Sequence, residues 1–327
     1  MNRAKAIVAC CDIGGTKGLV GLVGPAGALL AAEKYTLGTR TQPEQVMADV
    51  NAAMERLLAQ TGHDRAQVAG MGCSITGVID VFSGVMFTNH NMGWPERVPF
   101  RDLFAHYLGL PVAVEMDANA AALGEAWRGH GRGLRSFAYV IVGTGIGAGL
   151  IVDGRVVRGA HSTAGEIGHT VIVPGGPLCG CGKHGCLEAL ASGLAVARMA
   201  QAALTLGRGT ALREAGEPLT AARVAAAARD GDAVAREVFD TAAYYLGIGI
   251  ANLITLIDPE AVILGGGVAQ GASDLLLPGV RRSVHSHLNA WAARDIPILI
   301  TALGDHAGLL GAARAAQQTL PLSSEET

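Results

Sequence analysis

This sequence of 327 residues lacks several features that would point to whole classes of protein. Only 16% of its residues are charged and the net charge is −3, so the chain has no general attraction for a polyanion. Its densest basic stretch, "HGRGLR", is short and interrupted by glycine, whereas nucleic-acid binding would need a larger basic patch. We therefore expect no nucleic-acid partner.

Long apolar runs and a leader peptide are also missing. No uninterrupted apolar stretch reaches the roughly 18–20 residues that a membrane span requires. The nearest candidate, "LGIGIANLITLI", ends at Asp258 and Pro259 and is predicted to be a buried helix. The amino terminus enters a strand-like run almost at once, without the apolar core of a signal peptide. These features predict a cytoplasmic protein with no membrane partner.

Two common nucleotide-binding patterns are absent as well. The chain contains no G-x-x-x-x-G-K-[ST], which excludes a P-loop protein. Its runs "GTGIGAG" and "GGGVAQG" do not satisfy G-x-G-x-x-G, which argues against a Rossmann dehydrogenase. Glycine itself is abundant, with 46 residues, about twice the usual share of roughly 7%. Its clusters are typical of loops whose backbone approaches a ligand.

A strand–loop–strand–turn–strand pattern occurs twice, near residues 5–36 and 136–159. The first connection of each copy is a glycine- and threonine-rich loop, and such short connections predict antiparallel hairpins. The repeat predicts two similar α/β lobes that face one another. Either loop alone fits a simple tight turn. Together with "LGGG" at the end of a later strand, they favour a phosphate-rich ligand held by backbone N–H groups.

Between and after these units the sequence predicts further strands and helices. Strands are expected over residues 68–75, 111–117, 261–267 and 296–304, and helices over residues 43–62, 100–110, 118–129 and 307–318. The region beyond residue 188 is expected to be mainly helical until the strand at 261–267.

Six cysteines occur in the chain, three of them within eight positions. Because the cytoplasm keeps thiols reduced, disulfides account poorly for them, and Cys10, Cys11 and Cys73 are expected to be structural. The run "CGCGKHGCLE" (179–188) fits a disulfide pair, a redox pair or a metal site. A C-x-x-C redox pair needs a different spacing, while interspersed glycines let a short loop fold around zinc. A zinc site and unmetallated thiols remain as alternatives.

The chain resembles the ROK family of sugar kinases and, within it, the bacterial glucokinases. The motifs that carry this resemblance, in order along the chain, are "DIGGTK" (12–17), "MDANAAALGE" (116–125), "GTGIG" (143–147), "AGEIGHT" (164–170), "CGCGKHGCLE" (179–188) and "ILGGGV" (263–268). The resemblance implies an α/β, two-lobed actin/hexokinase-like fold, a duplicated ribonuclease H-like unit with a cleft between lobes. Residues 1–117 would form the small lobe, with a helix at about 305–327 packing back on it, and residues 118–304 the large lobe with the zinc loop.

The family pattern makes Asp117 the general base, although an Asp at the start of a helix is also a common N-cap. It implies a sugar site made of Gly77, Asn91, Asp117, Glu166, His169 and Glu188. The glutamates, without their flanking motifs, fit solvated surface charges. It also implies a zinc site made of His169, Cys179, Cys181 and Cys186, which would be structural because four protein ligands leave no open position.

ATP with Mg²⁺ is the implied cofactor, beside the structural Zn²⁺. The nucleotide-binding residues implied by the family are Asp12, Gly14, Gly15, Thr16, Lys17, Thr144, Gly145, Gly147, Gly265, Gly266 and Gly267. Lys17 fits equally a strand-edge lysine that points to water.

The implied activity is ATP-dependent phosphorylation of a hexose at the 6-hydroxyl, with glucose as the first expectation and an N-acetylhexosamine as the alternative. A sugar-responsive transcriptional regulator is less expected, because "DIGGTK" begins at residue 12, with no preceding DNA-binding domain. Met116 departs from the family, which has a sugar-binding Asn there. A contact worth about 1 kcal/mol is missing unless Met116 simply packs in the core. The family also implies a homodimer or homotetramer.

Overall fold

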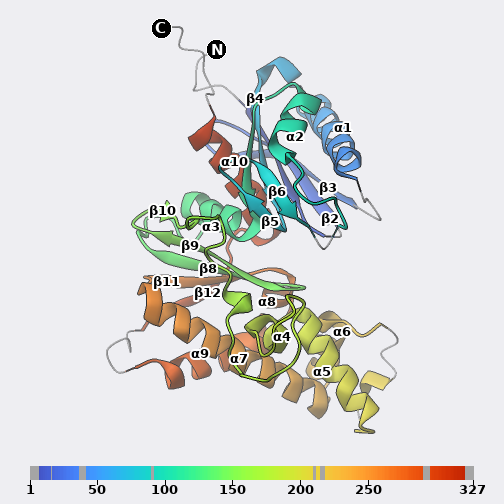
Figure 1. The fold of residues 1–327 in the computed structure, drawn as a ribbon, viewed down its shortest axis with the longest axis vertical. Coiled ribbons are helices and arrows are strands. Elements are labelled where there is room, and N and C mark those ends of the chain that lie inside the picture. The colour runs from blue at the N-terminus through green and yellow to red at the C-terminus, as the bar shows by residue number, and fades with distance from the viewer. Residues whose placement is uncertain are drawn as a thin grey trace.

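The computed structural model describes residues 7–15, 17–36, 42–89, 92–208, 211–213, 218–289 and 295–320. Two five-stranded sheets lie one above the other along the long axis of the molecule, with helices between and outside them (Figure 1). The part of the chain that forms the first sheet precedes the part that forms the second, and only the last helix returns to the first sheet.

The first sheet has the strand order β3-β2-β1-β4-β7. Its strands are β1 (Ile7–Ile13), β2 (Lys17–Val23), β3 (Leu29–Thr36), β4 (Val68–Ile75) and β7 (Val112–Met116). The first three form an antiparallel meander, and β4 and β7 run parallel to β1. Because helices cover both faces of the sheet, β1 is apolar at nearly every position rather than at alternate ones.

The second sheet repeats this arrangement, with the order β10-β9-β8-β11-β12. Its strands are β8 (Phe137–Val142), β9 (Ile146–Val152), β10 (Arg155–Val156), β11 (Ala261–Gly265) and β12 (Ile298–Ile300). The meander is again antiparallel, and β11 and β12 again run parallel to its first strand. Order and direction agree strand by strand, so the predicted duplication is confirmed.

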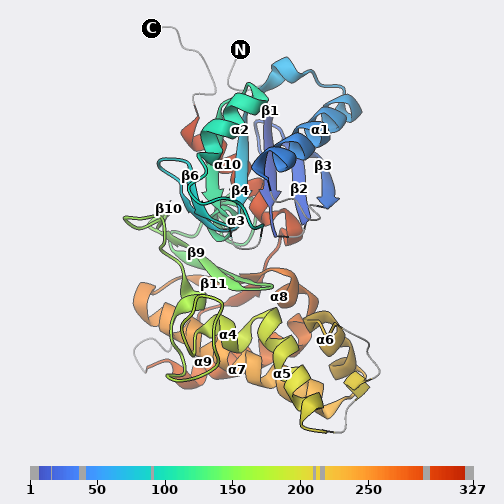
Figure 2. The ribbon, with the colours of Figure 1, turned by 45° about the vertical axis from the view of Figure 1, so that its right-hand side comes forward.

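The helices form three layers around the two sheets, as Figures 1 and 2 show. The outer layer of the first sheet is α1 (Pro43–Thr61), which contacts β2 and β3, and α2 (Phe100–Leu108), which contacts β7; their buried apolar residues join one core cluster with those of β1 and β4. The middle layer is α3 (Asp117–Arg128), which packs on β8 and β9, and α10 (Ala307–Thr319), which packs on β1 and β4. The lobe boundary at residue 117 stays a prediction.

The outer layer of the second sheet is made of α4 (Leu187–Ala191), α5 (Gly193–Thr205), α6 (Ala221–Arg229), α7 (Ala233–Ile257), α8 (Gly267–Gly271) and α9 (Ser273–His287). By length and composition α7 is the one helix, among the described residues, that is apolar enough to cross a membrane. Half of its most apolar window is buried in the protein, where it packs against α9 and α4.

A short hairpin was not predicted from the sequence. It consists of β5 (Val78–Asp80) and β6 (Val85–Thr88), and forms a separate two-stranded sheet beside the first sheet. Its strands are too short for a period-two pattern to emerge. Short 3-10 turns complete the fold: η2 (Arg65–Gln67), η3 (Ile167–His169), η4 (Ala211–Arg213) and η5 (Gly304–His306).

Candidate functional site

A cavity of about 640 Å³ lies between the two sheets. Gly14 and Gly15, from the β1–β2 connection, line one side of it, and Gly143 and Thr144, from the β8–β9 connection, line another. The two loops that the sequence repeat singled out therefore meet at one cavity. Bare backbone from both loops suits an anion, because peptide N–H groups can approach it without a side chain in the way.

The glycines after β11 differ from one another in what they contact. Gly266 and Gly267 line the cavity, and Gly266 has φ +87°, a conformation that other residues rarely adopt. Gly265 does not line the cavity: a Cβ there would lie 1.7 Å from Tyr139 Oη. We conclude that Gly265 makes room for a buried tyrosine, while the next two glycines face the cavity.

One end of the cavity is apolar, and no motif in the sequence pointed to it. Its walls come from α5, α6 and the residue before α6's N-cap, and include Leu194, Ala197, Leu219, Ala222 and Ala225. Leu194 is 65% exposed and lines the cavity, so its side chain is open to contact with a ligand. Aliphatic residues at helical spacing look like ordinary core residues, so the sequence held no signal that distinguished these cavity residues from residues of the hydrophobic core.

Asp117 is the first residue of α3 and lines the cavity. Its Oδ1 accepts a 2.7 Å hydrogen bond from the N–H of the next residue, Ala118, while the N-cap position itself is Met116, which makes no side-chain capping hydrogen bond. The pKa of Asp117 is raised to about 7: burial is the main cause, the hydrogen bond from Ala118 opposes it, and the negative charges of Asp12 and Glu166 contribute to the rise. A carboxyl group that titrates near neutrality suits proton transfer.

Asp12, on β1, lines the same cavity, and its Oδ1 accepts a 2.6 Å hydrogen bond from Ser74 Oγ on β4. Burial raises the pKa of Asp12 to about 6, the Ser74 hydrogen bond opposes this, and Asp305 adds to it. Gly308 of α10 leaves room for this carboxylate, because a Cβ there would lie 2.7 Å from Asp12 Oδ2. Two acidic side chains thus approach the cavity from neighbouring elements.

Two further carboxylates lie outside the cavity lining, and the charge of one of them, Glu166, acts on Asp117. Glu166 precedes η3, and burial raises its pKa, with His169 opposing the shift and Glu188 adding to it. Glu188 Oε2 accepts a 3.0 Å hydrogen bond from the Ile146 N–H of the β8–β9 hairpin. Gly145 allows this contact, because a Cβ there would lie 2.4 Å from Glu188 Oε2. Both glutamates are half-buried and close enough to affect each other, unlike solvated surface charges.

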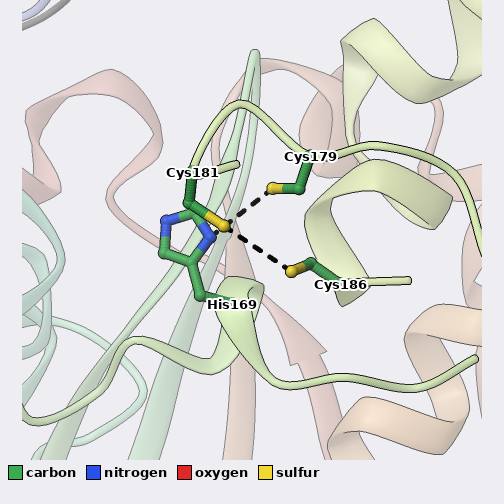
Figure 3. A group of neighbouring side chains, drawn as sticks. All are labelled: His169, Cys179, Cys181 and Cys186. Atoms are coloured by element: carbon green, nitrogen blue, oxygen red, sulfur yellow. Dashed lines mark hydrogen bonds between the residues drawn. The ribbon is translucent and has the colours of Figure 1, made fainter. Parts of the chain in front are cut away.

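Four side chains form a cluster that fits a metal ion, drawn in Figure 3: His169, Cys179, Cys181 and Cys186. Their ligand atoms all lie within 4.8 Å of one another. The Cys181 and Cys186 Sγ atoms are 3.7 Å apart, and Cys179 Sγ is 3.7 Å from His169 Nδ1. Tetrahedral zinc with Zn–S bonds of about 2.3 Å requires sulfurs about 3.8 Å apart. The three thiols and one imidazole therefore match a zinc site in both chemistry and spacing.

The two ring nitrogens of His169 have different neighbours. Its Nδ1 points toward the cysteines, while its Nε2 lies 3.8 Å from Glu166 Oε2. Cys179 Sγ is also 3.7 Å from Glu188 Oε1. The cluster therefore contacts both glutamates that the sequence assigned to the sugar.

Gly77 and Gly147, which were also predicted as site residues, do not line the cavity. Gly77 has φ +115° and packs against Thr88 of the β5–β6 hairpin, while its neighbour Thr76 lines the cavity. Gly147 lies in β9, where a Cβ would be 3.8 Å from Ala118 Cβ. Thr16, Asn91 and the side chain of Lys17 lie outside the described residues.

Met116 packs in the hydrophobic core of the first sheet and is 9% exposed. It supplies no hydrogen-bonding group to the cavity, so it does not substitute for the asparagine amide that the family resemblance leads us to expect at this position. Cys10, Cys11 and Cys73 are fully buried, as expected of structural thiols.

The duplicated fold and the motifs at its cavity can be compared with known proteins. The model of the ROK family matches residues 8–319, which is nearly the whole chain. The chain belongs to the ROK family. A glucokinase from Halalkalibacterium halodurans is 35% identical to this ROK protein over 310 residues, with 92% of each chain covered.

Solved ROK structures share the fold. A ROK glucokinase from Streptomyces griseus, in complex with glucose and AMPPNP, superposes with a TM-score of 0.81 at 35% identity, covering 96% of this chain and 99% of that one. A ROK transcriptional regulator, a homolog of the E. coli Mlc protein, superposes with a TM-score of 0.84 at 27% identity, covering 97% and 79%. Since kinases and regulators share this fold, the site must decide between their activities.

Proposed function

We propose that this ROK protein is a sugar kinase that transfers the γ-phosphoryl group of ATP to the 6-hydroxyl of a hexose, with glucose as its substrate. The glucokinases named above support this assignment. The observation that carries it is Asp117, a carboxyl with a pKa of about 7 at a cavity lined by two glycine loops. A regulator that only binds sugar has no need of a base at that place.

In this mechanism the sugar is held by Glu166, Glu188 and the free Nε2 of His169. Carboxylates accept hydrogen bonds from hydroxyl groups in defined directions, which suits a polyol. Asp117 removes the proton from the 6-hydroxyl as its oxygen attacks the γ-phosphorus in line. The leaving group is ADP, and the proton stays on the Asp117 carboxyl until solvent removes it. The transition state spreads charge over the phosphoryl oxygens, so alignment matters more than covalent help.

The nucleotide fits the rest of the cavity. Its phosphates would lie between the Gly14–Gly15 and Gly143–Thr144 loops, and its base against the apolar wall around Leu194. Mg²⁺ bound with ATP would supply positive charge, and Asp12 is the carboxylate that would face it. Gly266 and Gly267 leave space for the nucleoside.

A screen of hexoses tests the proposal most directly. The measurement is kcat/KM for each sugar, followed by coupled detection of the ADP released. We expect the value for glucose to exceed those for mannose, N-acetylglucosamine and N-acetylmannosamine. The missing amide at residue 116 removes one hydrogen bond to the sugar, which raises KM by roughly fivefold relative to an enzyme that has it. Preference for an N-acetylhexosamine would reassign the substrate, and no turnover with any hexose would reject the kinase.

The pH dependence of kcat/KM for glucose reports the base in the free enzyme. Because Asp117 must be deprotonated and its pKa is raised to about 7, activity should be full above that pH and fall as the pH drops below it. The decline should approach tenfold per pH unit well below pH 7, since one proton blocks the base. Thermal melts over the same range control for unfolding. A flat profile down to about pH 5 would contradict a base with this pKa.

The Cys₃His cluster supports a structural zinc site as part of this proposal. Four protein ligands close the coordination sphere, so the ion would hold the segment from His169 to Glu188 in shape rather than act on substrate. We also propose a cytoplasmic location, where ATP is available and thiolates stay reduced, and a homodimer or homotetramer as in the family expectation.

A further inference from the structure

A loop of residues 157–165, called the bridging loop below, leaves the second sheet after β10 and reaches the first sheet. Glu166 follows it directly in the chain. The loop is closed at its base, where the Arg158 carbonyl accepts a 3.1 Å hydrogen bond from the Ala164 N–H. At its end the Gly165 carbonyl accepts a 2.9 Å hydrogen bond from the Ala148 N–H of β9.

The first contact with the other sheet is an ion pair whose carboxylate is buried and whose arginine side chain is 25% exposed. Arg158 Nη2 and Nε donate to Glu115 Oε2 at 2.5 and 2.9 Å, and Glu115, on β7, is 1% exposed. The other oxygen of Glu115 accepts hydrogen bonds from the Met116 N–H and from Asn119 Nδ2, each at 3.2 Å. Met116 and Asn119 flank Asp117 in the chain, so the ion pair joins the bridging loop to the segment that carries the base.

Burying such a pair costs desolvation that hydrophobic residues would avoid. A buried ion pair is therefore weak evidence of stability, and one established use of such pairs is to fix a particular arrangement. Here the arrangement is the position of the bridging loop relative to β7. Arg135, just before β8, and Asp153, just after β9, form an ion pair at 2.7 Å at the end of the second sheet; both side chains are largely exposed, which offers a comparison.

The second contact is Ser162, which is 2% exposed and has φ +57°. Its Oγ donates to Asp80 Oδ1 at 3.2 Å and accepts from the Val81 N–H at 3.3 Å, both in the β5–β6 hairpin. A left-handed backbone conformation is costly for serine and is found where the surroundings enforce it. Two independent contacts thus hold the same loop, one to β7 of the first sheet and one to the β5–β6 hairpin beside it.

We propose that Glu115, Arg158 and Ser162 are positioning residues for the sugar: they fix the bridging loop so that Glu166 stays beside Asp117. This inference rests on the proposed function for its choice of ligand. None of the three residues lines the nucleotide cavity. They should therefore act on sugar binding and leave nucleotide binding unchanged.

The test compares Arg158→Met, Arg158→Lys, Glu115→Gln and Ser162→Gly with the wild type, by calorimetric titration with glucose and separately with AMPPNP. We expect the Kd for glucose to rise about tenfold in Arg158→Met, Glu115→Gln and Ser162→Gly, and less in Arg158→Lys, which keeps the charge. KM for glucose should follow the Kd while kcat stays within about threefold, because binding lost equally in ground and transition states affects KM alone. Arg135→Met is the matched control, and should change neither Kd.

Ser162→Gly separates positioning from folding. Glycine adopts a positive φ without strain, so this variant should melt at or near the wild-type temperature and still lose glucose affinity. Equal losses for glucose and AMPPNP, or an unchanged glucose Kd in well-folded Ser162→Gly and Glu115→Gln, would overturn the proposal.

Backbone hydrogen exchange measures the loop without any ligand. Amides of residues 164–169 should exchange faster in Arg158→Met and Ser162→Gly than in the wild type or Arg135→Met, and unchanged exchange would overturn the inference. A wild-type protein that binds no hexose would reject the proposed function, and the exchange data would then decide the positioning role alone.

Discussion

Asp117→Asn should lower kcat for glucose phosphorylation by about 10³-fold, because an amide cannot accept the hydroxyl proton and a positioned general base contributes about 10²- to 10⁴-fold. The substitution keeps the shape of the side chain, and its amide oxygen can still accept from the Ala118 N–H at the start of α3. Glucose should therefore bind with nearly unchanged affinity. Coupled turnover, calorimetric titration with glucose and a thermal melt measure the three effects.

Asp102→Asn provides the control for this experiment. Asp102 lies on α2 with its side chain 70% exposed and pairs with Arg101, away from the cavity. The same chemical change there should leave kcat within about twofold, as is usual for surface substitutions. Substantial turnover by Asp117→Asn would remove this residue from the role of base and make Asp12, a cavity carboxylate whose charge acts on Asp117, the next candidate.

The second-largest effect is expected for Cys186→Ser, which should abolish the proposed zinc site. Cys186 is fully buried just before α4, and the other three ligands cannot close a tetrahedron without it. We expect elemental analysis of washed protein to fall from about one zinc per chain to near zero. Because structural zinc contributes folding free energy directly, the protein should also lose roughly 3 kcal/mol or more of stability. Glucose affinity should drop with it, since His169 and Glu188 belong to the same segment.

Cys73→Ala separates loss of metal from loss of a core thiol. Cys73 is fully buried on β4, 3.1 Å from Cys11, and has no part in the cluster. This variant should retain zinc even if it melts at a lower temperature. Wild-type protein that is purified without chelator and contains no zinc would reject the metal site and leave the four side chains as a network of thiols and imidazole.

Local patterns predicted much of the fold, because they depend on contacts between near neighbours in the chain. Both hairpins were predicted from short glycine-rich connections between apolar runs, and the repeat predicted two sheets of one design. Helix α1 was predicted from its periodicity, and its ends agree with the structure to within one residue. The β5–β6 hairpin was missed because three or four residues carry too little pattern.

The candidate site was less accessible to sequence reasoning. Asp12, Asp117 and the glycine loops stood out because they lie in the motifs that carry the resemblance to the ROK family. The apolar wall around Leu194 and Leu219 did not stand out, because an aliphatic residue facing a ligand looks the same as one facing a core. Gly265 and Gly266 are adjacent and identical, yet one contacts Tyr139 and the other the cavity. Only neighbours from other strands distinguish them.

By itself, the order of residues determined the repeated α/β unit, the loops suited to phosphate, the cysteine cluster and the family. These follow from spacing, turn chemistry and composition, which are properties of short segments. The tertiary structure alone decided the pKa of Asp117, the burial of Met116 and the contact of Arg158 with Glu115. Each of these depends on contacts between groups 40 or more positions apart in the chain, or on how far the fold excludes water from a side chain. A local sequence pattern carries no information on either.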